Sequence, residues 1–312
     1  MLNVERYPQN FDQLFVVSDL HMGGEKTPRG NFQVFNKGKR LAAFIRYVIN
    51  RQSGSKDIAL VLNGDVFDSL AESDVAGYVA MDVDTIERMM SRLYRDPSFE
   101  PVWTALGEFV STSHCHLIIV MGNHDIELAL PAVEHSLRQK LCENDAKAES
   151  RLQFCAHGGG FSCFVGKARV FCTHGNELDK WNHVDYTALG QLANAMNAGR
   201  LINAADWRPN AGTRLVVDAM NHIKRRYPFV DLLKPENAAL GTVLAYLDRD
   251  LFKKLDLRDA LPIQRDINRG KDVVSNLLSV AGGSALFDAR PATAEEVFDE
   301  MLGSHVKTAL ST

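Results

Sequence analysis

The sequence lacks several patterns that would place the protein in a well-defined class. Its five cysteines form no Cys-x-x-Cys pair, which argues against a disulfide framework and against a zinc ribbon. No window approaches the roughly 20 consecutive apolar residues of a transmembrane helix. The first fifteen residues carry charged and amide side chains where a signal peptide would be apolar. We therefore expect a cytoplasmic protein without a transmembrane segment.

An excess of basic charge is also missing. The formal net charge is −4, so no global electrostatic signal favours nucleic acid or an anionic membrane as partner. Neither a Gly-x-Gly-x-x-Gly fingerprint nor a Walker lysine loop occurs, so dinucleotide and P-loop chemistry are unsupported. The run His157-Gly158-Gly159-Gly160 is typical of an esterase oxyanion loop, but no Gly-x-Ser-x-Gly nucleophile elbow accompanies it.

What is present is ample material for a layered core. Hydrophobic residues make up 46 % of the chain. Apolar runs at 14–18, 58–62 and 117–121 are typical of buried strands, and segments with apolar residues at helical spacing lie between them. Strands that alternate with helices favour parallel pairing and an α/β fold. The runs 161–165 and 168–173 flank Gly166-Lys167 and predict a hairpin.

The pattern becomes helical beyond Trp181. Apolar residues recur at helical spacing to about residue 260, with breaks at three prolines. Gly282-Gly283 then predicts a turn, and Thr293 with Glu296 forms a capping box for a last helix. We expect a core at 1–183, a helical cap at 184–270 and a C-terminal helical segment at 271–312.

Polar side chains with metal-binding potential follow four of the apolar runs. In an open α/β sheet, ligands bind just outside the carboxyl ends of the strands. Carboxylate, imidazole and amide groups at several strand ends therefore predict a shared metal site. The four segments are Ser18-Asp19-Leu20-His21, Asn63-Gly64-Asp65-Val66-Phe67-Asp68, Gly122-Asn123-His124-Asp125 and Thr173-His174-Gly175-Asn176.

Spacing within the first two segments suits coordination. Asp19 and His21 are two residues apart, which in an extended backbone points both side chains to the same side. Gly64 allows a sharp turn that would project the Asp65 carboxylate into the shared site. Each pattern alone is more often a turn or a surface feature. Asp68 is expected beside the site and not as a ligand.

The third segment is the most specific one. An amide oxygen such as that of Asn123 is a hard donor that suits manganese, iron or magnesium. The adjacent His124 would face away from Asn123 and could serve chemistry, with Asp125 accepting from its ring. The alternative interpretation is a strand-to-helix turn with Asn or Asp as the helix cap. His174 follows the last run and would be structural if it stood alone.

These four segments, in this order, resemble the calcineurin-like metallophosphoesterase superfamily. The resemblance implies a layered α/β sandwich with a helical insertion and a centre of two divalent metal ions, for which Mn²⁺ is the expectation and Fe or Zn are the alternatives. It implies that Asp19 and His21 bind the first ion, that Asp65 bridges both, and that Asn123 and His174 bind the second. A metal-bridging hydroxide would attack phosphorus, His124 would act as general acid, and Asp125 would orient it.

The sequence departs from the family in one motif. The family supplies two further histidines in Gly-His-x-His, and this motif does not occur here. After His174 the chain offers only His183, His222 and His305, and none of them follows an apolar strand. Two explanations stay open. The chain stops before a further part of the core, which would leave the second half of the sheet incomplete, or it is a variant in which water or His183 takes the vacant positions.

The wording of the motifs is nearest to the branch that contains UDP-2,3-diacylglucosamine diphosphatase. That enzyme typically has Arg where this sequence has His124, so the lipid substrate is not assigned. The expected partner is a phosphorylated small molecule or a lipid-linked substrate, with substrate-binding residues and oligomeric state unknown. A nuclease and a non-catalytic binding module on the same fold are the alternatives. The five predicted ligands and His124 favour chemistry over mere binding.

Overall fold

The computed structural model describes residues 9–27, 30–31, 33, 35–72, 75, 78–200, 202, 207–217 and 221. The chain divides into two units. The first comprises residues 1–24, 33–175 and 185–207, and the second comprises residues 25–32, 176–184 and 208–312. The predicted domain boundaries at 183 and 270 stay predictions, and the features predicted at 282–283 and 293–296 lie outside the described residues.

A four-stranded parallel sheet is the centre of the first unit. Its strand order is β2-β5-β6-β7, and all three neighbouring pairs are parallel. The apolar runs predicted as strands form three of its members. Five of the six residues of β5 are buried, as expected for a strand covered on both faces. The bounds are Gln13–Val17 for β2, Ile58–Asn63 for β5, Cys115–Val120 for β6 and Leu152–Cys155 for β7.

A three-stranded sheet packs on one face of this sheet. Its order is β1-β8-β9, where β1 (Gln9–Phe11) pairs in parallel with β8 (Phe161–Val165), and β8 pairs antiparallel with β9 (Ala168–Cys172). The predicted hairpin at Gly166-Lys167 is confirmed. Apolar side chains from both sheets form one buried cluster: Phe11, Ala59, Val61, Ile118, Val120, Phe161, Cys163 and Cys172.

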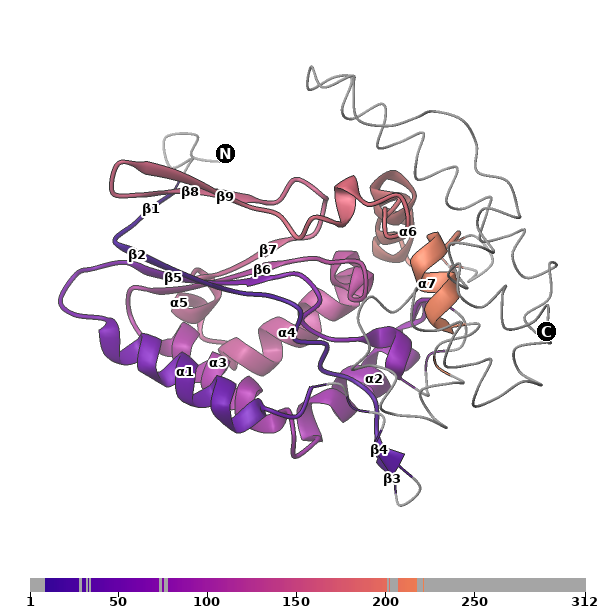
Figure 1. The fold of residues 1–312 in the computed structure, drawn as a ribbon, viewed down its shortest axis with the longest axis horizontal. Coiled ribbons are helices and arrows are strands. Elements are labelled where there is room, and N and C mark those ends of the chain that lie inside the picture. Colours follow the sequence, from indigo (N-terminus) through magenta and orange to yellow (C-terminus); the bar gives the residue numbers. More distant parts are fainter. Residues whose placement is uncertain are drawn as a thin grey trace, which may run out of the picture. The chain divides into compact units, whose positions relative to one another are not determined.

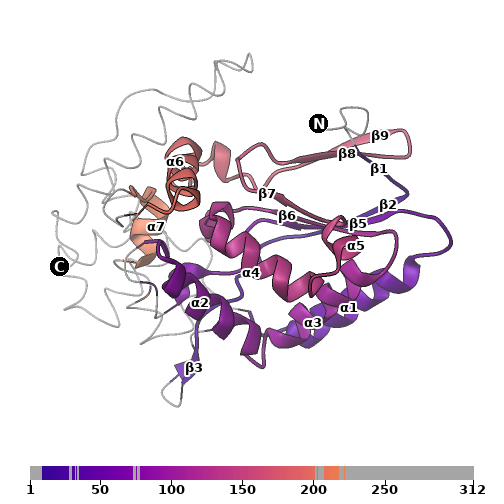
Figure 2. The ribbon, with the colours of Figure 1, turned by 180° about the vertical axis from the view of Figure 1, so that it is seen from behind.

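Helices cover the other face of the four-stranded sheet. Figures 1 and 2 show α1, α3 and α4 side by side along that face, with the smaller sheet on the opposite side. The predicted periodicity explains α1, in which Ile45 and Val48 are fully buried. Asp82 caps α2 by accepting from the Thr85 amide. The bounds are Gly38–Arg51 (α1), Val83–Arg95 (α2), Glu100–Ser111 (α3), Pro131–Cys142 (α4), Ala146–Glu149 (α5) and Tyr186–Asn197 (α6), with short 3₁₀ turns at Ser69–Ala71 (η2) and Ile126–Ala129 (η3).

Three short elements and a turn are described in the second unit. Strands β3 (Lys26–Thr27) and β4 (Gly30–Asn31) pair antiparallel, and Asn176–Leu178 form the 3₁₀ turn η4. Helix α7 (Ala211–Leu215) is tied to the preceding part of the same unit by a bond from the Gly212 amide to the Trp181 carbonyl, 2.7 Å. Within the described part of the chain, no helix has the length and apolar character needed to cross a bilayer. The layers of the first unit make the fold an α/β sandwich.

Candidate metal centre

The predicted ligands meet at one edge of the parallel sheet. Asp19 and His21 follow β2, Asp65 follows β5, and Asn123 follows β6, so all lie beyond the carboxyl ends of neighbouring parallel strands. His174 follows β9 of the smaller sheet. The two sheets thus supply ligand candidates to the same place.

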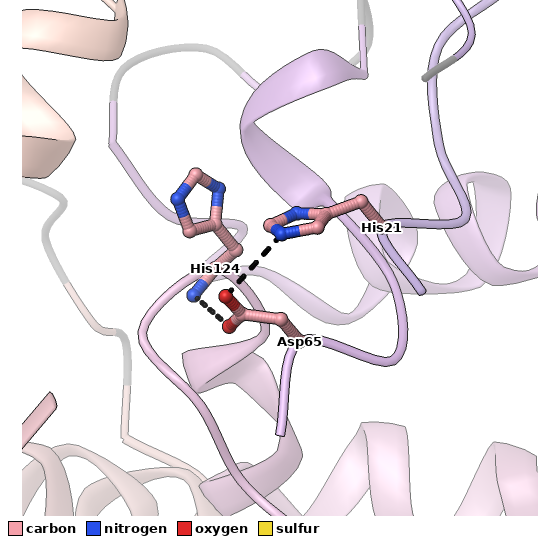
Figure 3. A group of neighbouring side chains, drawn as sticks. All are labelled: His21, Asp65 and His124. Carbon is pink, nitrogen blue, oxygen red and sulfur yellow. Dashed lines mark hydrogen bonds and ion pairs between the residues drawn. The ribbon is translucent and has the colours of Figure 1, made fainter. Parts of the chain in front are cut away.

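Asp65 lies in the middle of this group, with 3 % of its surface exposed. Its Oδ2 atom is 3.5 Å from Nε2 of His21 and 3.2 Å from Nε2 of His174. Its Oδ1 atom accepts from the backbone amide of His124 at 2.9 Å, and Figure 3 shows His21 and His124 on either side of this carboxylate. Asp65 therefore touches side chains or backbone from three other motifs.

Two groups of metal-ligating side chains share Asp65. One group is His21, Asp65 and His124, and the other is Asp19, Asp65 and His174, with the ligand atoms of each group within 4.8 Å of one another. The shared carboxylate agrees with the bridging position predicted for Asp65. Asp19 falls in the group of His174, whereas the family pattern pairs it with His21. The assignment of ligands to individual ions stays a prediction.

The backbone at these motifs is held in an unusual conformation. Asp19, His21 and Asp65 have φ values of 55°, 47° and 53°, in the left-handed region that costs a non-glycine residue of the order of 1–3 kcal/mol. Backbone bonds between the two loops hold it in place, from the Asp19 amide to the Gly64 carbonyl and from the His21 amide to the Asp65 carbonyl. Such strain is common at functional sites.

Two glycines make room for the side chains. A Cβ atom on Gly122 would overlap the Asp65 carboxylate, and a Cβ atom on Gly64 would overlap the His174 ring. Gly64 also has φ of 85°, which a side chain would strain. The glycine in each motif is therefore required by the close approach of backbone to a ligand candidate.

The charges of the centre fit a divalent cation. Burial by itself would raise the pKa of Asp65, but the bond from His174 and the nearby His124 and His21 lower it to about 2. Burial likewise would lower the pKa of His174, but its bond to Asp65 raises it to about 9. Without a cation, then, a proton on the His174 ring balances the buried Asp65 carboxylate. Metal binding replaces such a proton, and the donor set of carboxylates and imidazoles suits a divalent ion.

Asp68 is the carboxylate beside the predicted general acid. Its Oδ1 atom is 3.2 Å from Nδ1 of His124, and its Oδ2 atom is 3.5 Å from Nδ1 of His21. Burial would raise the pKa of Asp68, but the charges and hydrogen bonds of His124 and His21 lower it well below its usual range. The prediction that Asp68 lies beside the centre as a supporting group is consistent with this position.

Asp125, which was predicted to orient His124, bonds two backbone amides in the structure. Asp125 is fully buried, and its two oxygens accept from the backbone amides of Gly122 at 2.7 Å and Val66 at 2.6 Å. Burial and the Asp65 charge raise its pKa to about 7. Its carboxylate joins the loops that follow β5 and β6. Sequence neighbourhood suggested Asp125, whereas the fold brings Asp68 to the ring from another loop.

The remaining predicted residues are less completely placed. Asn123 is 7 % exposed and precedes His124, whose amide bonds Asp65, and its role as a ligand stays a prediction. His183 belongs to the second unit. His222 and His305 lie outside the described residues.

Sequence reasoning did not single out Asn63. Its carbonyl accepts from Nδ1 of His174 at 3.0 Å, and its side-chain amide donates to the Thr173 carbonyl at 2.9 Å. The only signal for this role in the sequence was the position of Asn63 at the end of an apolar run, directly before Gly-Asp.

An α/β sandwich with carboxylate and imidazole groups gathered at its strand ends has the side chains of a metal-binding protein. The family model of calcineurin-like phosphoesterases matches residues 13–282. Because this span covers most of the 312 residues, the chain belongs to the calcineurin-like phosphoesterase family. No curated protein and no solved structure matches the chain. The family implies divalent metal ions and, in general terms, metal-dependent hydrolysis of phosphoesters.

Proposed function

We propose that the protein hydrolyses a phosphoester or phosphoanhydride bond with two divalent metal ions, Mn²⁺ being the first choice. The observation that carries the proposal is the position of Asp65, buried between His21 and His174 and shared by both groups of ligand candidates. Asp19, His21, Asp65, Asn123 and His174 would hold the ions. When bound, the ions supply Lewis-acid polarisation of the phosphoryl group and a nucleophile at neutral pH.

His124 would supply the proton that the leaving oxygen needs. Its ring lies 4.8 Å, centroid to centroid, from that of His21, and its Nδ1 faces Asp68 at 3.2 Å. A carboxylate at Nδ1 favours a proton there and holds the ring in place, as a ring that is to donate a proton to the leaving oxygen requires. A general acid of this kind contributes roughly 10²–10⁴-fold to the rate.

The substrate is proposed only at the level of its reacting group. The motif sequences resemble those of UDP-2,3-diacylglucosamine diphosphatase, and this resemblance favours a phosphoanhydride among the candidate substrates. Because this chain has His124 where that enzyme usually has Arg, phosphomonoesters and phosphodiesters also stay among the candidate substrates. The expected substrate is a phosphorylated small molecule or a lipid-linked one, and the cytoplasm as its location remains a prediction from the sequence.

The test is turnover by metal-stripped and metal-loaded protein. Three probes cover the bond types: p-nitrophenyl phosphate, bis-p-nitrophenyl phosphate and a UDP-sugar with its diphosphate bond. We expect the stripped protein to be inactive and added Mn²⁺ to restore turnover of at least one probe. Full turnover by the stripped protein would refute the proposal. A protein that bound none of the divalent metals offered to it would refute the proposal as well.

A further inference from the structure

Two strands from different sheets must be held together for the centre to form. Asp65 follows β5 of the larger sheet and His174 follows β9 of the smaller sheet, and these strands are not paired. The 3.2 Å approach of His174 to Asp65 therefore depends on contacts that cross from one sheet to the other.

Asn63, the last residue of β5, makes two such contacts. Its side-chain Nδ2 donates to the carbonyl of Thr173 at 2.9 Å, and its own carbonyl accepts from Nδ1 of His174 at 3.0 Å. One residue of the larger sheet thus binds the backbone before the histidine and the histidine ring itself. Gly64 completes the contact, because its backbone lies directly against that ring.

These bonds determine which ring nitrogen is available. A carbonyl oxygen only accepts, so Nδ1 of His174 carries a proton. Nε2 then faces Asp65, and it is the ring nitrogen that can bind a cation. A hydrogen bond at the other nitrogen is the usual way in which a protein orients an imidazole ligand.

The amide of Asn63 is not explained by packing alone. Its Oδ1 atom is buried and has no hydrogen-bond partner among the described residues. An unsatisfied buried acceptor is unfavourable, and an apolar side chain of similar size would avoid it. The amide makes one bond that an apolar side chain could not make, which is the bond to the Thr173 carbonyl next to the candidate ligand His174.

We infer that Asn63 is a positioning residue for the metal centre: it holds His174 on Asp65 and fixes Nε2 of that ring as the coordinating nitrogen. The inference rests on the proposed function in so far as the centre binds metal. The substitution that tests it is Asn63→Leu, which keeps the approximate volume and the backbone carbonyl that accepts from His174 and removes the side-chain donor to Thr173. The matched control is Val61→Ala, two residues earlier on β5 and fully buried, which weakens the same strand and the apolar cluster between the sheets but removes no bond to Thr173 or His174.

The first measurement uses metal-free protein with ¹⁵N-labelled histidine. We expect the Nδ1–H of His174 to give a slowly exchanging signal in the wild type, assigned by its loss in His174→Ala. This signal should be lost or exchange at least roughly tenfold faster in Asn63→Leu and should persist in Val61→Ala. An unchanged signal in Asn63→Leu would overturn the inference, whether or not the protein binds metal.

The second measurement is calorimetric titration with Mn²⁺. Asn63→Leu should weaken one binding step by roughly 10–100-fold, the range for groups that support a metal ligand, while Val61→Ala leaves it unchanged. In the double variant Asn63→Leu/His174→Ala, the loss should equal that of His174→Ala alone, because Asn63 acts on metal binding only through His174. If the loss of Mn²⁺ affinity in the double variant were the product of the two single-variant losses, the inference would be overturned. A wild type that binds no metal but shows the expected NMR result would refute the proposed function and leave the positioning role supported.

Discussion

Asp65 and His124 are neighbours in space, and we assign them different tasks. The buried Asp65 carboxylate contacts the candidate ligands His21 and His174, whereas the His124 ring pairs with Asp68 and its backbone amide bonds Asp65. Loss of the shared carboxylate should therefore affect metal binding, and loss of the ring should affect the reaction.

Asp65→Ala should release the bound metal, and His124→Ala should retain it. We expect metal content near zero in Asp65→Ala, because both ligand groups lose their common member. His124→Ala should keep the metal and lose turnover by roughly 10²–10⁴-fold. Elemental analysis and kcat on the most active probe measure the two effects. Asp57→Ala, at the other end of β5, is the control, and equal metal loss in both test variants would contradict the division of tasks.

Asp68 and Asp125 also have different tasks, although both are buried carboxylates. Asp68→Asn should lower kcat by roughly 10–100-fold, since it weakens the group that orients His124 and His21. Asp125→Asn should instead destabilise the fold by about 1–3 kcal/mol, because an amide offers one acceptor where two backbone amides need one each. Urea unfolding of metal-free protein and kcat separate the two. A larger loss of kcat in Asp125→Asn, with unchanged stability, would restore Asp125 as the partner of His124.

At the scale of elements, the loops after β5 and β6 determine the geometry of the centre. Gly122 and Asp125 belong to the loop that connects β6 to η3, and Asp65 and Asp68 belong to the loop that connects β5 to η2. The Asp125 bonds to Gly122 and Val66 tie these loops together. A change that separates the loops should therefore disturb the metal site without replacing a ligand.

Gly122→Ala should have this effect. The added methyl group would overlap the Asp65 carboxylate, so we expect Mn²⁺ affinity to fall by at least roughly tenfold and stability to fall by about 1–3 kcal/mol. Gly159→Ala is the matched control, because a Cβ atom there meets no atom within 4 Å. Calorimetric titration and thermal unfolding measure the two effects. Wild-type affinity in Gly122→Ala would show that the backbone approach to Asp65 is not needed.

Glu127 on η3 should make stability depend on pH. It is fully buried, its Oε1 accepts from the Ala80 amide at 2.9 Å, and burial raises its pKa from 4.5 to about 7. Between pH 4.5 and about pH 7, the Glu127 carboxyl group is ionised in the unfolded chain and protonated in the folded protein. The contribution of Glu127 to the free energy of unfolding is thus fully present below pH 4.5 and is lost as the pH rises to about 7.

Glu127→Gln should remove this dependence, since Gln keeps the acceptor for Ala80 and carries no charge. Relative to wild type, the variant should gain up to about 3 kcal/mol of unfolding free energy between pH 4.5 and pH 7. Urea unfolding of metal-free protein at both pH values measures the gain. Glu87→Gln on the exposed side of α2 is the control, and a gain no larger than the control's would contradict the buried, neutral state of Glu127.

At the scale of the whole molecule, the centre joins the two sheets of the first unit, so metal should stabilise the fold. Binding at 100 times the dissociation constant adds about 2.7 kcal/mol, which for a protein of 312 residues raises Tm by about 4 °C. Stripped protein should show this rise on addition of Mn²⁺, and Asp65→Ala should not. Differential scanning calorimetry measures it. An equal shift in both proteins would mean that Mn²⁺ acts elsewhere.

Much of this molecule could be predicted from local patterns. The strands β2, β5 and β6 are continuous apolar runs, and the hairpin of β8 and β9 has a turn at Gly166-Lys167. Strand direction then requires that Asp19, Asp65 and Asn123 lie at one edge of the sheet, because parallel strands share their carboxyl ends. The partner of His124 could not be predicted in this way, because Asp68 reaches it across 56 residues of sequence.

The amino-acid sequence by itself determined which chemical groups the centre contains and the strand ends after which they follow. That information is local, since apolar periodicity and a few polar residues after each run are sufficient. The tertiary structure alone decided how these groups pair: Asp68 with His124, Asp125 with two backbone amides, and Asn63 with His174. Those pairings depend on left-handed backbone turns and on the packing of one sheet on another, which no spacing in the sequence records.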